Sequence, residues 1–383
     1  MKRTIVCLGL CLLVPAMGWC QSQKKSGKTE QIVEMNEPGM WEEEELEPAK
    51  LHVRNVVFII GDGMGTAQAY SSIVARGEKS NFLRFPVTGF SRTYSLDSYT
   101  TDSGAGGTAL MTGHRVNNHA IAKGPDGTDY PSILQQAHDL GKVTGFVVTS
   151  SVLDATPAST YAHVSNRKEK DSISMQLAQS TINIAIGGDL NAFKKENRKD
   201  GKSPLDTLKA RGIELVTRID SLAESNSKRM FGLLTDENPD PKPERVELLC
   251  RGVEKALDVL NASENGFVLM IEGSQIDWAC HNNDAQYLKA EMDDFENMLG
   301  IVLDFAEHDG NTLVVMTADH ETGGLGLIDG NIENGQNECK FTTKGHTGVM
   351  VPVYAYGPMA KNFTGIHHNV EIPELIMKEL KKQ

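Results

Sequence analysis

Residues 56–65 read VVFIIGDGMG, and this short stretch indicates how the chain folds around it. Its first five residues form an apolar run dominated by β-branched side chains, and the glycines that follow end the run. A run of this kind predicts a strand that is buried on both faces of a sheet. Comparable runs occur later in the chain: they end at Thr149, Glu272 and Thr317, and a further one covers residues 349–356.

Helical patterns lie between these strands. Within residues 284–307, apolar side chains recur at i, i+4, i+7 and i+11 from Phe295 to Ala306. Shorter helical patterns cover residues 131–140, 243–260 and 371–381. The alternation predicts an α/β fold, a three-layer sandwich in which helices flank both faces of a central, mostly parallel β-sheet. In such sheets the active groups collect at the carboxyl ends of the strands.

Composition and charge exclude several classes of protein. The chain has 383 residues, of which 39% are hydrophobic, and 38 basic against 51 acidic side chains give a net charge of −13. This composition excludes wholesale disorder. An acidic chain without a basic stripe is not expected to bind nucleic acid specifically. Beyond residue 20 no apolar run is long enough to span a membrane.

The N-terminus has the features of an export signal. Residues 1–20 combine a basic start, an apolar stretch and small residues before a cleavage site, so we expect a periplasmic or secreted protein. A lipid anchor on Cys20 is disfavoured, because Trp19 is bulky where that processing needs a small side chain. The polar residues 21–50 are expected to form an arm or linker.

The remainder of the chain, residues 51–383, is expected to form a single domain. Between about 164 and 250 the apolar pattern weakens and charges accumulate, which predicts a surface insertion. Beyond the export signal the cysteines are Cys250, Cys280 and Cys339, and none lies in a CxxC motif. At most one disulfide can form among three cysteines, and buried thiols are the favoured interpretation.

Metal-ligand side chains follow each of the first four strands. They are Asp62; Asp154 and Thr156; Glu272, Asp277 and His281; and Asp319 and His320, with His346 later in the chain. Taken singly these have ordinary explanations, since GDGMG suits a tight turn and an aspartate four residues from a histidine suits an exposed helical pair. Together, converging strand ends would crowd several carboxylates that repel one another, and divalent cations remove that cost. Asp with His suits zinc, and an oxygen-only subset suits magnesium.

The segment TDSGAGGTALMTG at residues 101–113 adds a candidate nucleophile. Ser103 lies at the start of a helical pattern, where unpaired N–H groups and the helix dipole favour negative charge. The alternative is that Asp102 or Ser103 only caps the helix, and this role is compatible with catalysis. A neighbouring metal ion would lower the pKa of the hydroxyl.

These segments together resemble the alkaline phosphatase family. IGDGMG, TDSGAGGTALMTG, DATPASTYAHVSNR, EGSQIDWACH, TADHETGG and KGHTG occur in the family's order, and the match runs from about residue 54 to 360. The resemblance implies a metal-dependent enzyme that hydrolyses phosphate monoesters through a phosphoserine. None of these residues is expected to contact the alcohol portion, which predicts a broad range of monoesters, and export is predicted by residues 1–20.

The resemblance also implies a role for each candidate residue. Ser103 would be the phosphorylated nucleophile, Arg167 would grip two phosphate oxygens, and Asp102 would orient Arg167. Two zinc ions and one magnesium ion are implied. One zinc would be held by Asp277, His281 and His346, the second by Asp62, Asp319 and His320, and the magnesium by Asp62, Thr156 and Glu272 with Asp154 acting through bound water.

Two departures from the family's pattern leave properties open. Trp278 follows Asp277 where other members often carry a charged or polar side chain that reaches toward phosphate or magnesium, and an indole cannot make that contact. Residues 321–345 are a short insertion where larger relatives place a subdomain that helps to build a dimer. Both a monomer and a homodimer are therefore compatible with the sequence.

Competing functions remain for the same residues. A sulfatase would need Cys or Ser in a CxPxR-like context, whereas Ser103 lies in DSGAG. A phosphodiesterase of the same superfamily stays open, although Arg167 favours monoesters. A non-catalytic exported protein that binds metal or phosphate would require the loss of Ser103 or of a ligand, and none is missing.

Overall fold

The computed structural model describes residues 52–242, 245 and 247–382. The export signal predicted at residues 1–20 and the arm predicted at 21–50 lie outside the described residues. Among the residues that are described, no helix is both long and apolar enough to cross a membrane.

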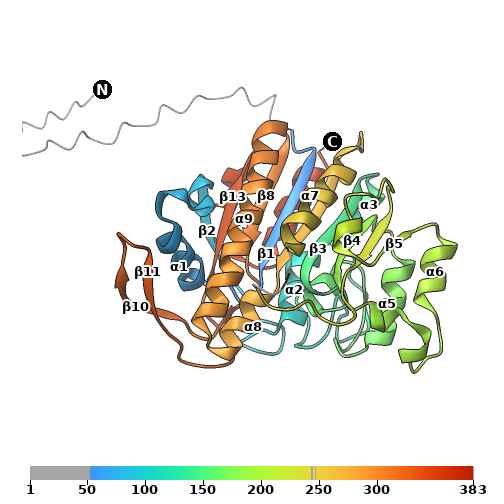
Figure 1. Cartoon of the computed structure of the whole chain (residues 1–383), viewed down its shortest axis with the longest axis horizontal. Helices are drawn as coiled ribbons and strands as arrows, with labels where there is room; N and C mark the ends of the chain where they lie inside the picture. Colours follow the sequence, from blue (N-terminus) through green and yellow to red (C-terminus); the bar gives the residue numbers. More distant parts are fainter. Residues whose placement is uncertain (1–51, 243–244, 246, 383) are drawn as a thin grey trace, which may run out of the picture. The chain divides into compact units, whose positions relative to one another are not determined.

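Ten strands form one sheet, in the order β14-β2-β13-β8-β1-β7-β3-β4-β6-β5 (Figure 1). Their bounds are β1 Asn55–Gly61, β2 Val87–Arg92, β3 Val143–Ser151, β4 Ile184–Gly188, β5 Glu214–Val216, β6 Met230–Leu233, β7 Phe267–Gly273, β8 Thr312–Thr317, β13 Val351–Tyr356 and β14 Gly365–His368. Strand β13 runs antiparallel to β8 and β2, and the other neighbouring pairs of this sheet are parallel. The predicted mostly parallel sheet is confirmed.

The central strands are buried on both faces, as their continuous apolar sequences predict. In β1, Phe58 and Ile60 pack into one hydrophobic core, and Val57 and Ile59 pack into the other. Alternate residues of a strand face opposite sides, so one short run supplies both cores. The two cores lie on opposite faces of the sheet, which is the predicted three-layer arrangement.

Helices cover both faces. Helices α1, α7, α8 and α9 contribute to the core on one face, where α7 and α9 cross in front of the strands in Figure 1, and α2 to α6 with α10 contribute to the other core. Their bounds are α1 Thr66–Arg76, α2 Ser103–Thr112, α3 Ile133–Asp139, α4 Ala155–Ala158, α5 Lys170–Gln179, α6 Pro204–Ala210, α7 Leu248–Asn261, α8 Gln275–Asn282, α9 Ala285–Asp309 and α10 Glu371–Leu380. The helical patterns predicted at residues 131–140, 284–307 and 371–381 correspond to α3, α9 and α10.

The segment expected to be a surface insertion, residues 164–250, is built into the sheet. It carries β4, β5 and β6, which form one edge of the sheet, together with α5 and α6. Residues 184–188 and 230–233 are fully buried, while the charged run KKENRKDGK lies in the connection between β4 and α6. The strands are only five and four residues long, so their apolar signal is diluted by the charged connections around them.

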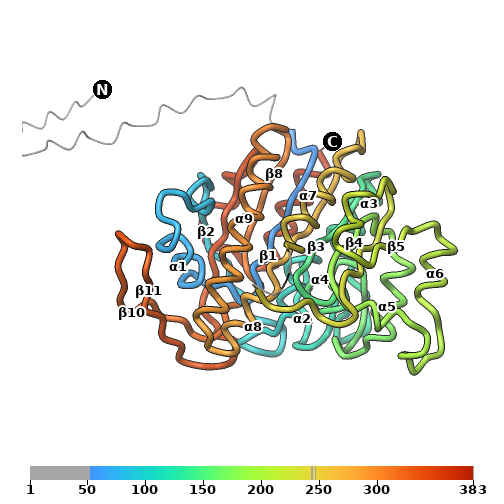
Figure 2. The backbone as a smooth tube through the Cα atoms, in the orientation of Figure 1, coloured from blue at the N-terminus to red at the C-terminus, as the bar shows by residue number. Residues whose placement is uncertain are grey.

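Residues 321–345, the second expected insertion, form short strands outside the main sheet. Strands β10 Gly326–Asn331 and β11 Gln336–Lys340 pair as an antiparallel hairpin, which lies beside α1 (Figure 2). Strand β9 Glu321–Thr322 pairs with β12 His346–Thr347. This pairing brings the segment after His320 against the segment that begins with His346.

The three cysteines of the described chain are free. Cys280 is buried, and Cys250 and Cys339 are half-buried. Burial raises the pKa of the Cys250 thiol to about 12, so its thiolate is disfavoured. The interpretation as buried thiols is confirmed for Cys280, whereas Cys250 and Cys339 are only partly buried.

Candidate active site

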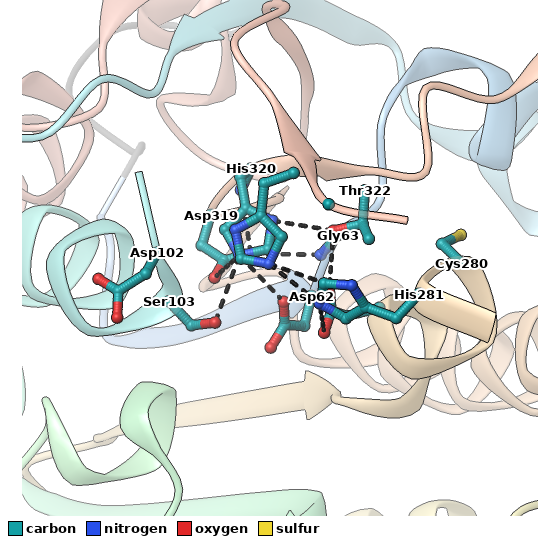
Figure 3. A network of polar contacts seen from close by, with 12 residues as sticks. Asp62, Gly63, Asp102, Ser103, Cys280, His281, Asp319, His320 and Thr322 are labelled. Carbon is teal, nitrogen blue, oxygen red and sulfur yellow. Dashed lines mark hydrogen bonds and ion pairs between the residues drawn. The ribbon is translucent and has the colours of Figure 1, made fainter. Parts of the chain in front are cut away.

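The carboxyl ends of neighbouring parallel strands bring the predicted ligands together. Strand β1 lies between β7 and β8, with Ile60 opposite Glu272 on one side and Thr317 on the other. Asp62 and Asp319 each follow their strand by one or two residues, so both lie at the same edge of the sheet. Figure 3 shows the side chains of Asp62 and Ser103 extending toward the ring of His320.

Two groups of side chains have ligand atoms within 4.8 Å of one another. They are Asp277, His320 and His346, and Asp62, Asp319 and His320. Four of these five side chains are buried, and His346 is half-buried. The structure therefore gathers residues that lie more than 280 positions apart in the sequence, from Asp62 to His346.

His281 lies beside the first group, and the orientation of its imidazole and of that of His346 favours a cation. His281 directs Nδ1 at the carbonyl of Lys344 (2.5 Å), and His346 directs Nδ1 at the carbonyl of Thr101 (2.9 Å). With both Nδ1 atoms donating, the two Nε2 lone pairs face each other at 3.1 Å. His281 Nε2 also lies 3.2 Å from Asp277 Oδ2. Lone pairs and a carboxylate that face one point need a metal ion or a proton between them.

Electrostatics around Asp277 agree with this geometry. Burial alone would raise its pKa, but with no metal ion bound a protonated His281 donates from Nε2 to the carboxylate, which outweighs burial and lowers the pKa of Asp277 to about 2. The hydrogen bond to Asp277 raises the pKa of His281 to about 9. The carboxylate is thus ionised at neutral pH, as a ligand must be.

In the second group His320 presents Nε2 to several partners at once. This nitrogen lies 3.2 Å from Asp319 Oδ2, 3.6 Å from Asp62 Oδ1 and 3.3 Å from Ser103 Oγ. Asp62 Oδ1 and Asp319 Oδ2 are buried and have no hydrogen-bond donor. Burial lowers the pKa of His320 to about 4, so its ring is neutral. A neutral imidazole and two unpaired carboxylate oxygens suit zinc.

An oxygen-only group adjoins the second one. Burial raises the pKa of Glu272 to about 8, and the charges of Asp154 and Asp319 add to the effect. Burial also raises the pKa of Asp62, with contributions from Asp319, Asp277, Glu272 and Asp154. The hydroxyl oxygen of Thr156 is buried without a hydrogen-bond partner. Unpaired oxygens among mutually repelling carboxylates suit a hard cation such as magnesium.

Ser103 is the first residue of helix α2, and Asp102 is its N-cap. The Asp102 carboxylate accepts a hydrogen bond from the backbone N–H of Ala105 at 3.0 Å, which fixes the start of the helix. Ser103 is buried, with its hydroxyl beside His320. Asp102 therefore caps the helix, and the adjacent Ser103 is the candidate nucleophile.

Arg167 lies between two carboxylates. Its Nη1 donates to Asp102 Oδ2 at 3.2 Å, and its Nη2 donates to Asp154 Oδ1 at 3.0 Å. Although burial acts to lower the pKa of Arg167, these two charges raise it above its ordinary value. Against the effect of burial, the backbone N–H groups of Ala105 and His119, together with Arg167, hold the pKa of Asp102 below its ordinary value. The charge of Arg167, with that of Lys170, does the same for the pKa of Asp154. Asp102 and Asp154 thus both contact Arg167, one at each side of the guanidinium.

Two residues of this site were not predicted. The Thr322 hydroxyl donates to Asp277 Oδ1 (2.5 Å) and lies 3.2 Å from His320 Nδ1 (Figure 3). Thr322 follows His320 by two residues in an extended segment, and side chains at this spacing point to the same side of the strand. The sequence could therefore have indicated that these two side chains lie close together. His119 lies 3.2 Å from Asp102, and no pattern in its sequence neighbourhood points to that contact. Trp278, on α8, is half-buried.

Comparison with known proteins identifies relatives across the chain. A family model described as alkaline phosphatase matches residues 53–332 and 327–382. Alkaline phosphatase 4 of Bacillus subtilis is 31% identical over 87% of this chain and 90% of that protein. Alkaline phosphatase of Escherichia coli is 28% identical over 83% of this chain and 84% of that protein.

Solved structures show the same architecture. The alkaline phosphatase of the Antarctic bacterium TAB5 aligns with a TM-score of 0.82 and 36% identity, covering 87% of this chain and 99% of that one. A mutant of that protein, solved with Mg bound, aligns with a TM-score of 0.81 and 37% identity over 86% of this chain and 98% of that one.

Proposed function

This chain belongs to the alkaline phosphatase family, and from that membership we propose the course of its reaction, its metal content and its location. It is a metal-dependent phosphatase, whose substrates are small phosphate monoesters. We propose that it acts on a broad range of such esters and forms a phosphoserine on Ser103. Export by residues 1–20, a periplasmic or secreted location and assembly as a homodimer remain predictions from the sequence.

The position of Ser103 supports the covalent step best. Its hydroxyl lies 3.3 Å from His320 Nε2 at the amino-terminal end of α2. There the helix dipole favours the alkoxide over the hydroxyl. The alkoxide would attack phosphorus, the ester oxygen would leave, and the serine would carry the phosphoryl group until water releases it.

We propose that the three ligand groups hold two zinc ions and one magnesium ion. For one zinc the proposed ligands are Asp277, His281 and His346, with His281 in place of His320, whose Nε2 faces Asp319 and Ser103. The other zinc would be held by Asp62, Asp319 and His320, and the magnesium by Asp62, Thr156 and Glu272, with Asp154 nearby. When bound, such ions lower the pKa of a hydroxyl and offset the charge of the attacking and leaving oxygens. The buried, donor-free oxygens of Asp62, Asp319 and Thr156 support this assignment.

Arg167 would bind the substrate's phosphate. Its guanidinium can offer two parallel N–H groups to two phosphate oxygens, a geometry that lysine cannot reproduce. Asp102 and Asp154 hold the guanidinium from two sides, which limits its rotation before the substrate arrives. Since this clamp contacts phosphate rather than the alcohol portion, a broad substrate range is expected.

A paired assay tests the proposal. Hydrolysis of a chromogenic phosphate monoester and of the matching diester is measured for the wild type and for Ser103→Ala, with and without chelator, alongside elemental analysis of zinc and magnesium. We expect monoester turnover to exceed diester turnover, to vanish with chelator and to fall at least about 10³-fold in Ser103→Ala. Metal content should stay near that of the wild type, since three other side chains hold each ion.

The matched control is Thr112→Ala, which removes a buried hydroxyl from the opposite end of α2. It should keep wild-type turnover if the loss in Ser103→Ala reflects the nucleophile and not the helix. Near-normal turnover in Ser103→Ala would remove this serine from the covalent step. Faster hydrolysis of the diester would instead favour a phosphodiesterase.

A further inference from the structure

His119 has a backbone conformation that residues with side chains rarely adopt. Its φ angle is +74°, in the left-handed region. Such a conformation is costly for a residue other than glycine, and it persists only where surrounding contacts hold it. The contacts of His119 therefore indicate what maintains this conformation.

His119 contacts both Asp102 and Arg167, the ion pair of the proposed phosphate clamp. The backbone N–H of His119 donates to Asp102 Oδ1 at 3.0 Å, and its carbonyl accepts a hydrogen bond from the backbone N–H of Arg167 at 2.7 Å. Its imidazole Nδ1 lies 3.2 Å from Asp102 Oδ2. One residue thus joins the helix N-cap of α2 to the loop that carries the guanidinium.

The neighbouring residue anchors this arrangement. Asn118 accepts a hydrogen bond from the backbone N–H of Asp102 at 3.1 Å and donates to the carbonyl of Thr100 at 3.1 Å. A side chain added at Gly104 would approach the carbonyl of Ala120 at 3.0 Å, so the loop packs closely against the first turn of α2. The position of His119 relative to Asp102 is therefore determined by several independent contacts.

Asp102 Oδ2 is shared between two donors. Arg167 Nη1 and His119 Nδ1 both lie 3.2 Å from this oxygen. The tautomer of His119 with its proton on Nδ1 can donate to it. A hydrogen bond from His119 partly neutralises the charge of Asp102 and so weakens its ion pair with Arg167. Less interaction energy is then lost when Arg167 turns from Asp102 to a phosphate.

We propose that His119 is a positioning residue that sets how strongly Asp102 retains Arg167, and thereby sets the affinity for phosphate. This proposal rests on the proposed function, in which Arg167 binds the phosphate. It assigns His119 no direct contact with substrate, because its imidazole acts through Asp102. The exposed ring, at 64% of its full accessibility, allows substitution without opening the core.

Binding of inorganic phosphate to the metal-loaded protein tests this role. Isothermal titration calorimetry gives the dissociation constant, and steady-state kinetics give KM and kcat separately. His119→Gly removes the imidazole while glycine accepts the left-handed backbone without strain, so both backbone hydrogen bonds can remain. We expect the dissociation constant of phosphate and KM to rise about 3- to 10-fold, as loss of one charge-assisted contact implies, while kcat changes less than about 2-fold.

Two further variants separate the imidazole from the strain of the loop. His119→Asn should restore phosphate affinity to within about 2-fold of the wild type, because asparagine tolerates the left-handed region and its amide can donate to Asp102. Ala122→Gly relieves the left-handed φ of +45° three residues further along the loop and removes no contact to Asp102. It should leave phosphate affinity unchanged. Thermal unfolding confirms that each variant is folded.

The outcomes that overturn the role of His119 are distinct. Wild-type phosphate affinity in His119→Gly, an equal loss in Ala122→Gly, or no recovery in His119→Asn would each contradict it. Arg167→Ala serves as the reference for the proposed function itself. Unchanged phosphate binding in that variant would overturn the clamp, and it would do so whatever His119→Gly shows.

Discussion

The hydroxyl of Thr322 links the two nitrogen-containing ligand groups. It donates to Asp277 Oδ1, and it lies where it can accept a hydrogen bond from His320 Nδ1–H. With Nδ1 engaged in this way, the lone pair of His320 is left on Nε2, which faces Asp62, Asp319 and Ser103. Partners of this kind fix the tautomer and the orientation of a metal ligand. The buried hydroxyl of Thr322 thus orients a metal ligand in each of the two groups.

Replacement of Thr322 by valine should weaken zinc retention. Valine has nearly the same shape but removes the hydroxyl that donates to Asp277 Oδ1 and that can accept from His320 Nδ1. We expect zinc affinity to fall about 10- to 100-fold, measured by competition with a chromogenic chelator. Thr317→Val is the control, because Thr317 is equally buried and its hydroxyl donates only to the carbonyl of Pro352 at 2.9 Å. Wild-type zinc affinity in Thr322→Val would refute the role.

At the scale of the element, helix α2 approaches the ligands through a face of glycines. A Cβ on Gly106 would meet the carbonyl oxygen of Asp319 at 3.0 Å, and one on Gly107 would meet the Cα of Thr156 at 3.2 Å. The helix is buried along its whole length. The absence of side chains on this face lets α2, with Ser103 at its amino-terminal end, pack against helix α4 and the segment that follows β8.

A side chain on this face should displace the helix. In Gly106→Val the added methyl groups have no space beside Asp319, so α2 must shift and carry Ser103 with it. We expect turnover to fall about 10²-fold or more, and the free energy of unfolding to fall by about 1–3 kcal/mol. Monoester hydrolysis and thermal unfolding provide the two measurements.

The matched control for this helix is Gly300→Ala. Gly300 lies within α9, and a Cβ there would approach only the side chain of Asn81, at 3.2 Å. Alanine favours a helix over glycine, so this variant should be at least as stable as the wild type and fully active. If Gly106→Val kept normal turnover, the close approach of α2 would not matter for catalysis.

At the scale of the whole molecule, the sheet brings buried carboxylates together at one edge. Burial at this edge shifts the pKa values of the site. In the absence of metal ions, burial raises the pKa of Glu272 from 4.5 to about 8, and the hydrogen bond to Asp277 raises the pKa of His281 from 6.5 to about 9. At pH values between the ordinary and the raised pKa of each group, the folded chain therefore binds more protons than the unfolded chain. Its free energy of unfolding must fall as pH rises through this range.

Chelator-treated protein should accordingly be less stable at pH 8.5 than at pH 6. We expect the midpoint of thermal unfolding to drop by more than about 3 °C between these values. Readdition of zinc and magnesium should reverse the drop, because bound cations replace the protons. In Glu272→Gln one of the titrating groups is removed, so the chelated variant should show a smaller drop. Equal midpoints at the two pH values would contradict the electrostatic account of the site.

How much of the site could be predicted depended on where each signal lies in the chain. Asp62, Glu272 and Asp319 stand directly at or after their strands, so the apolar runs marked them as neighbours at one sheet edge. Contacts such as those of Thr322 and His119 join segments that no local pattern connects. The register of β9 with β12 and the packing of a loop on α2 decide them.

The amino-acid sequence alone determined the succession of strands and helices, the α/β class and the ligand-bearing ends of the strands, because apolar periodicity acts between residues close in the chain. Tertiary structure decided the neighbours of each strand, the reversed direction of β13, the inclusion of residues 164–250 in the sheet and the division of the ligands into groups. These features arise from contacts between distant segments, whose free energy depends on how whole faces pack and not on any local pattern.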